Sequence, residues 1–150
     1  MHKERGTNMI RFTVPGNPVG KGRARTCSSK YTGKVHSFTP GKTVSYENLV
    51  KILATEASAQ YYASEPLTLC VTAYYEIPKS TSKKNVALML AGNMRPIKKP
   101  DLDNIIKIVA DALNGVCYHD DSQFVVVIAE KYYAEIARVE VEIGGVGEDG

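Results

Sequence analysis

The chain has 150 residues, of which 43% are hydrophobic and 23% charged, and its net charge is +3. This length fits one domain with its own hydrophobic core. No apolar run approaches the roughly 18 residues that a membrane-spanning helix needs, so the sequence predicts no such helix and no membrane partner.

The three cysteines, Cys27, Cys70 and Cys117, are odd in number and widely spaced. This spacing argues against a disulfide framework and against a zinc site. We therefore expect reduced cysteines, as in a cytoplasmic protein. We also expect Cys70 to belong to the core, because it lies in an apolar run.

The charges are strongly segregated along the chain. Residues 1–42 carry a net charge of +8, residues 43–78 carry −3, residues 79–107 carry +5 and residues 108–150 carry −7. The two basic segments would suit a polyanion such as nucleic acid. Solvated loops are the commoner origin of such charge runs, and charge alone leaves both interpretations open.

Apolar periodicity predicts the first elements in chain order. A strand begins at Ile10, residues 16–42 form a long basic loop or an irregular hairpin, and residues 43–62 form a helix. The expected buried face of this helix comprises Val44, Leu49, Ile52, Leu53, Ala57 and Tyr61.

Residues 66–78 alternate as a strand, residues 79–84 form a connector, and residues 85–91 form a short helix. The clearest helix spans residues 101–113, and strands follow at 123–129 and 138–143. This order predicts an α+β fold, a two-layer α/β domain with helices packed on a mixed β-sheet. We expect a flexible N-terminal extension over 1–8, one folded domain over 9–143 and a flexible tail over 144–150.

The helix over residues 101–113 carries a charged stripe opposite its apolar one. Asp103, Lys107 and Asp111 are spaced four apart and therefore share a face. Asp101 and Asp103 lie in the first turn, where the helix dipole favours carboxylates. Ionised carboxylates are the ligands that Mg²⁺ prefers.

Each part of this pattern also has a purely structural interpretation. An aspartate after a proline is typically a cap, Asp103 with Lys107 is typically a surface ion pair, and residues 120–121 are typical of a turn. Their combination with Lys98 and Lys99 favours a metal-dependent DNA nuclease, which needs carboxylates for metal and cations for the phosphate backbone. The residues alone leave the two interpretations evenly balanced.

Four stretches of the sequence together resemble a known family. They are R-P-I-K-K-P-D-L-D-N-I-I-K at 95–107 with D-A-L-N-G at 111–115, D-D-S-Q at 120–123, P-G-N-P-V-G-K-G-R-A-R at 15–25 and Y-E-I-P-K-S at 75–80. These stretches resemble the RusA family of Holliday junction resolvases, especially its phage and prophage branch. The similarity covers roughly residues 9–143.

The resemblance implies a homodimer that cuts a four-way DNA junction with paired symmetric nicks in DNA recombination and repair. It implies dependence on Mg²⁺, with Mn²⁺ as a substitute, and no further small-molecule cofactor. The implied setting is the cytoplasm of a bacterial or phage-infected cell.

The resemblance also assigns residues. Asp101, Asp103 and Asp121 match the catalytic, metal-binding acids, and Lys107 matches the essential lysine. Asn104 and Asp120 match as supporting residues. The segment 113–120 is slightly shorter than in the best-known members, so the third acid can fall on Asp120 or Asp121, of which we favour Asp121.

The residues that we expect to contact DNA phosphates, positioning the duplex arms without reading sequence, are Lys98, Lys99, Lys21, Arg23 and Arg25. Two other functions stay open: a junction-binding module without catalysis, and a metal-dependent phosphohydrolase of a small substrate. The acidic set argues against the first, and the basic N-terminal segment against the second.

Overall fold

The computed structural model describes residues 9–22, 25–28, 35–38, 41–58 and 60–147. At its centre lies a four-stranded sheet in the order β1-β6-β4-β5. The strands are β1 (Ile10–Pro15), β4 (Leu67–Glu76), β5 (Phe124–Ala134) and β6 (Arg138–Gly145). Strand β6 is antiparallel to β1 and β4, whereas β4 and β5 are parallel, so the sheet is mixed as predicted.

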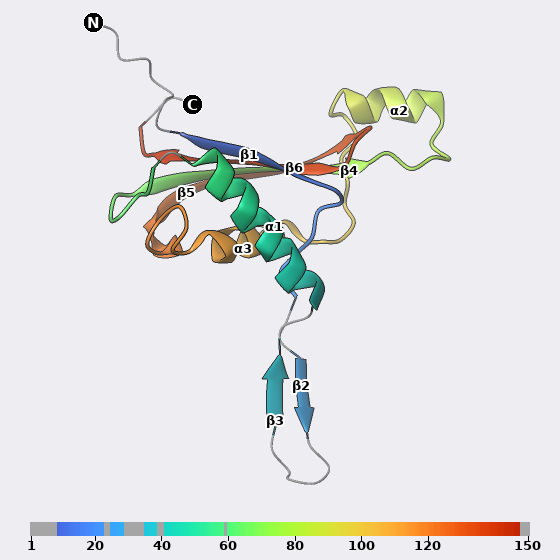
Figure 1. The fold of residues 1–150 in the computed structure, drawn as a ribbon. Coiled ribbons are helices and arrows are strands. Elements are labelled where there is room, and N and C mark those ends of the chain that lie inside the picture. The colour runs from blue at the N-terminus through green and yellow to red at the C-terminus, as the bar shows by residue number, and fades with distance from the viewer. Residues whose placement is uncertain (1–8, 23–24, 29–34, 39–40, 59, 148–150) are drawn as a thin grey trace, which may run out of the picture.

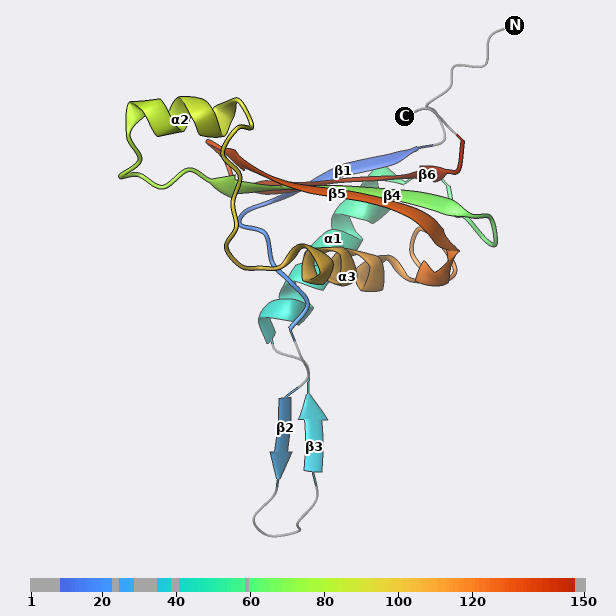
Figure 2. The same ribbon diagram turned by 180° about the vertical axis from the view of Figure 1, so that it is seen from behind.

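Two helices, α1 (Gly41–Ala57) and α3 (Leu102–Leu113), cover the same face of this sheet (Figures 1 and 2). Side chains alternate between the faces of a strand, so every second residue of β1, β4 and β6 points at these helices. The predicted α+β fold, with helices packed on a mixed sheet, is therefore confirmed. The resulting core includes Ile10, Val14, Leu67, Leu69, Val71, Val141, Ile143, Val50, Ile105, Ile108 and Val109.

The third helix, α2 (Lys83–Leu90), lies apart from α1 and α3, near one end of the sheet (Figure 1). It starts earlier than the sequence predicts because Ser82 caps it, accepting a hydrogen bond from the backbone N–H of Asn85 at 3.3 Å. Residues 78–100 thus leave the sheet and return to it just before α3.

Two expectations about the core are wrong. The buried face of α1 comprises Thr43, Tyr46, Val50 and Ala54, whereas the predicted Val44, Ile52, Ala57 and Tyr61 are exposed. Apolar residues occur all around this helix, so its own periodicity does not identify the face that meets the sheet.

Cys70 is the second correction. It is only partly buried, because its neighbours Leu69 and Val71 take the helix-covered face of β4 and strand alternation turns Cys70 to the other face.

The basic segment before α1 contains a two-stranded hairpin of β2 (Arg25–Ser28) and β3 (Val35–Phe38), the irregular hairpin that was one of the two alternatives. It extends away from the sheet and helices (Figures 1 and 2). The expected extension at residues 1–8 lies outside the described residues, as do residues 148–150 of the expected tail, whereas Gly144 and Gly145 belong to β6. Among the residues described, no helix combines the length and apolar character that crossing a membrane requires.

Candidate active site

The N-terminus of α3 presents two carboxylates to solvent. Asp101 occupies the N-cap position in an extended conformation, but its side chain makes no capping hydrogen bond. Asp103 follows in the first turn and is exposed. Because α3 is anchored by its buried apolar face, these two acids stay at its outer end, where the helix dipole favours negative charge.

Lys99 and Pro100 bring the chain to this helix end. The ammonium of Lys99 lies 3.3 Å from the carboxylate of Asp101, and both side chains are more than half exposed. The carbonyl of Pro100 accepts a 2.8 Å hydrogen bond from the hydroxyl of the buried Tyr75. Strand β4 therefore fixes the position from which α3 starts.

The glycine-containing segment after β1 is fastened across the first turn of α3. The backbone N–H of Lys21 donates to the carbonyl of Asn104 at 2.9 Å, and that of Gly22 donates to the hydroxyl of Thr43 at 3.2 Å. A Cβ at Gly20 would lie 2.9 Å from the Cβ of Pro100 and 3.0 Å from that of Asn104. This close approach explains the glycine, since a side chain would push the segment off α3.

Lys21 joins α1 to α3. Its ammonium is hydrogen-bonded to Glu47 of α1 and lies 3.4 Å from the carboxylate of Asp111 on α3. Burial alone would lower the pKa of Lys21, but the hydrogen bond to Glu47 and the charges of both acids raise it above its ordinary value. The ammonium thus remains charged and already has two anionic partners.

The same Asp111 carboxylate contacts the lysine expected to be catalytic. The ammonium of Lys107 lies 3.7 Å from it, one helical turn away, and the Lys107 side chain is 61% exposed. These contacts make a row of ion pairs with alternating charge, which we call the ion-pair row and which consists of Glu47, Lys21, Asp111 and Lys107. Lys107 is at its solvent end.

The second pair of acids lies at the other end of α3. Asp120 caps a short 3-10 helix, η1 (Asp121–Gln123). Its carboxylate accepts a hydrogen bond from the N–H of Ser122 at 3.1 Å, and its own backbone N–H donates to the side-chain oxygen of Gln123 at 3.0 Å. These hydrogen bonds from Ser122 lower the pKa of Asp120. The backbone N–H of Asp121 donates to the side chain of Asn114 at 2.8 Å, whereas its carboxylate makes no ion pair within the described part of the chain.

The two acidic pairs do not meet within one chain. The twelve residues of α3 separate them, and at 1.5 Å per residue the helix spans about 17 Å. Within the described ranges, no three carboxylate, histidine or cysteine side chains lie close enough together to share a metal ion. The exposed oxygens of Asp101 and Asp103 fit a hard divalent cation chemically, but one chain does not supply Asp121 beside them.

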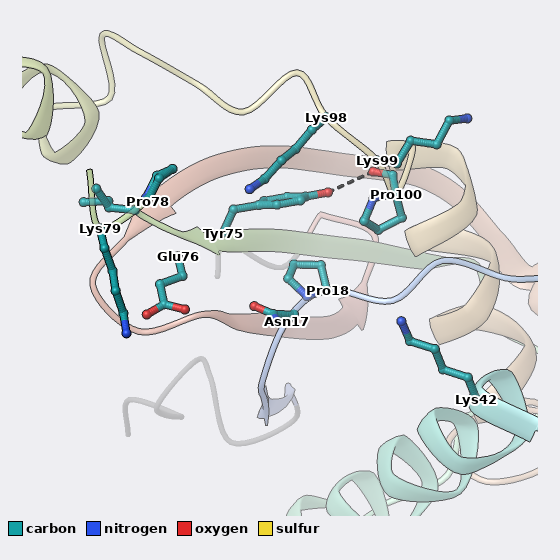
Figure 3. A pocket seen from close by; sticks show the side chains of 11 residues that line it. Asn17, Pro18, Lys42, Tyr75, Glu76, Pro78, Lys79, Lys98, Lys99 and Pro100 are labelled. Atoms are coloured by element: carbon teal, nitrogen blue, oxygen red, sulfur yellow. Dashed lines mark hydrogen bonds between the residues drawn. The ribbon is translucent and has the colours of Figure 1, made fainter. Parts of the chain in front are cut away.

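A hollow of about 480 Å³ adjoins the start of α3. Four lysines line it: Lys42 of α1, Lys79 after β4, and Lys98 and Lys99 before α3. Figure 3 shows Lys98 lying across the ring of Tyr75; the Lys98 ammonium is 5.9 Å from the ring centroid. We call this hollow the lysine pocket.

The expected DNA contacts fall into three groups. Lys98 and Lys99 are exposed and line the lysine pocket. Lys21 is held in the ion-pair row between Glu47 and Asp111. Arg23 and the side chain of Arg25 lie outside the described residues.

The RusA endodeoxyribonuclease family matches residues 15–144. The chain belongs to the RusA family. It is 41% identical over 136 residues to the uncharacterized protein YqaN of Bacillus subtilis (strain 168), covering 89% of this chain and 94% of the relative. It is also 30% identical over 115 residues to the crossover junction endodeoxyribonuclease rusA of Lactococcus phage r1t, covering 76% and 81%. The resemblance predicted from the sequence motifs is confirmed, and the protein is an endodeoxyribonuclease.

Sequence reasoning missed some residues that surround the RusA motif in space. Lys42 and Glu76 line the lysine pocket although they come from elements distant in sequence. Glu47 joins the ion-pair row from α1 in the same way. One signal was available, because Glu76 and Lys79 belong to the Y-E-I-P-K-S stretch. Nothing in the sequence of α1 distinguishes Lys42 or Glu47 from ordinary surface charges.

Proposed function

We propose that this RusA protein resolves four-way DNA junctions by paired symmetric nicks during recombination and repair. The proposal rests on one juxtaposition: the exposed Asp101 and Asp103 lie beside a pocket lined by four lysines. Carboxylates that can hold a metal ion, next to cations that can hold a phosphate backbone, suit phosphodiester hydrolysis in DNA. The name of the phage r1t relative points to the same substrate.

Asp101, Asp103 and Asp121 would hold Mg²⁺, with Mn²⁺ as a substitute. When bound, such an ion supplies Lewis-acid activation of the phosphodiester and of water. The Asp121 carboxylate makes no ion pair in the described part of the chain, whereas the Asp120 carboxylate accepts the capping hydrogen bond, and this difference supports Asp121 as the third acid. Asn104 supports the site through its carbonyl, which fixes the segment around Lys21.

Lys107 would stabilise the charge that develops on the scissile phosphate, and Asp111 would position it. The contact of 3.7 Å keeps the Lys107 ammonium near α3 while leaving it exposed to a substrate. Lys21 and Glu47 hold Asp111 from the other side. Lys98 and Lys99 would contact the DNA backbone.

The active form would be a homodimer whose sites are shared between two chains. Strand β5 is an edge of the sheet, and its residues Val125, Val126, Val127 and Ile128 are between 39% and 62% exposed. An unpaired apolar edge of this kind is a template for pairing with another strand. Two-fold symmetry would also match the two equivalent cuts in a junction.

Such pairing would explain the separation of the acids. Asp121 begins η1, which leads directly into the start of β5, whereas the carbonyl of Pro100 is hydrogen-bonded to Tyr75, which pairs with Tyr133 at the far end of β5. An antiparallel pairing of two β5 strands would therefore bring Asp121 of one copy level with the start of α3 of the other.

The direct test is cleavage of a labelled four-way junction, a linear duplex of the same sequence and a generic phosphoester, with and without Mg²⁺. We expect cleavage of the junction only, and only with Mg²⁺. The variant Asp103→Asn should lose on the order of a thousandfold in cleavage rate, several kcal/mol of transition-state stabilisation, while junction binding persists. The matched control Glu56→Gln, an exposed acid on α1, should cut at the wild-type rate. Wild-type cleavage by Asp103→Asn would refute the site.

A further inference from the structure

We propose that the lysine pocket receives a single unstacked nucleotide of the cleaved strand and recognises its base through Glu76. This inference rests on the proposed junction cleavage, and it adds a binding site beside the acids. The volume of the lysine pocket, about 480 Å³, lies within the roughly 300–1,000 Å³ of pockets that hold small organic ligands. A duplex does not fit such a space, whereas one nucleotide does.

The position of the pocket connects it to the acids. A second hollow of about 540 Å³, lined by Asp101 and Asn104 among others, shares Pro18, Lys42, Lys99 and Pro100 with it. The two hollows therefore adjoin along the segment before α3. A strand whose phosphate reaches Asp101 has its neighbouring nucleotide beside the lysine pocket.

The charges of the lining suit a nucleotide more closely than a bare phosphate. Lys42, Lys79 and Lys98 provide cations for the backbone. Glu76 is the one carboxylate in the lining, and it is exposed. A carboxylate repels phosphates, but it accepts hydrogen bonds from the exocyclic amino group of a base.

The remaining lining residues suit a base. Pro18, Pro78 and Ile77 offer apolar surfaces, and Asn17 offers an amide that both donates and accepts. Figure 3 shows Asn17 and Pro18 together on one side of Tyr75 and Lys98 on the other. Burial and the negative charge of Asp101 raise the pKa of Tyr75 to about 12, so its hydroxyl keeps the proton that it donates to Pro100.

This arrangement would select branched DNA. A nucleotide inside a duplex must be unstacked and unpaired before it enters a pocket, whereas at a crossover, where the strand passes between two arms, this step costs less free energy. The pocket would thus admit a nucleotide from a junction more readily than one from a linear duplex. It would also favour bases that carry an exocyclic amino group over thymine.

The experiment places the fluorescent base 2-aminopurine, which carries such an amino group, at each position flanking the cut site of a four-way junction. The full-length Asp103→Asn variant binds the junction in Mg²⁺ without cutting it. We expect a fluorescence increase of several-fold at one position beside the cut, as for an unstacked base, and no increase with linear duplex. No increase at any position, with binding intact, would overturn the proposal.

Base recognition is tested by cleavage. Wild-type protein should cut junctions with an amino-bearing base at the identified position faster than junctions with thymine. Glu76→Gln should reduce this preference by about tenfold, because its neutral amide replaces the carboxylate acceptor. The control Glu56→Gln should retain it. An unchanged preference in a folded Glu76→Gln protein would overturn the role of Glu76, whereas absence of junction cleavage by wild-type protein would instead refute the proposed function.

Discussion

The two ends of α3 carry the same kind of residue in different states. At the N-terminal end, Asp101 stands at the N-cap without capping, and its carboxylate contacts only the exposed Lys99 among the described residues. At the C-terminal end, Asp120 caps η1, and one of its carboxylate oxygens accepts a hydrogen bond from the N–H of Ser122. The comparison separates acids that are available for chemistry from an acid that is used for folding.

The comparison also explains why one chain does not complete the site. An α-helix is rigid, so its twelve residues keep the available acids of its two ends apart. In the proposed homodimer, a second copy would supply the missing carboxylate without any change in the fold.

The largest effect concerns the sharing of the site. Asp103→Asn and Asp121→Asn should each abolish cleavage, but an equimolar mixture allowed to exchange chains should recover about one quarter of the wild-type sites. Recovery arises because a mixed dimer has one site with both wild-type acids. The measurement is cleavage of a four-way junction by the mixture, which should give mainly singly nicked product.

Two controls accompany the mixing experiment. Adding Val127→Lys to both chains should prevent recovery, since a charge on the exposed edge of β5 disfavours strand pairing. If the unmodified mixture stays inactive although mixed dimers are present, the site lies within one chain and the dimer proposal fails.

A smaller effect is expected at the middle of α3. Asp111→Asn should lower the single-turnover cleavage rate about tenfold and leave junction affinity unchanged, because it releases Lys107 without removing it. The same substitution should have no further effect in a Lys107→Met background. An equal additional loss in that background would show that Asp111 acts through the fold alone.

The smallest effect concerns the cap at the C-terminal end. Asp120→Ala should lower Tm by a few degrees, because η1 loses its capping hydrogen bonds. The Asp120 pKa is lowered in the folded chain, so its stabilisation is present above the ordinary pKa of 3.8 and is lost as pH falls below that value. Thermal unfolding of wild type and variant should therefore converge in acid. A variant that loses cleavage without losing Tm would instead make Asp120 the third acid.

How much of this was predictable from sequence differs from element to element. The helix α3 and its acids follow from local periodicity and from a motif contained in one segment. The buried face of α1 and the pairing of Lys21 with Glu47 and Asp111 depend on which distant elements meet. Local sequence does not encode that meeting, so it does not reveal that the ammonium of Lys21 lies between Glu47 of α1 and Asp111 of α3.

The close approach at Gly20 has a mechanical consequence. The residues that lead into the β2–β3 hairpin are bonded to the first turn of α3 through Lys21 and to α1 through Gly22. The hairpin extends away from the rest of the protein (Figure 1), and the segment that precedes it is anchored on the helix that carries Asp101 and Asp103. A duplex arm bound by the hairpin would therefore be coupled through this segment to the position of those two carboxylates.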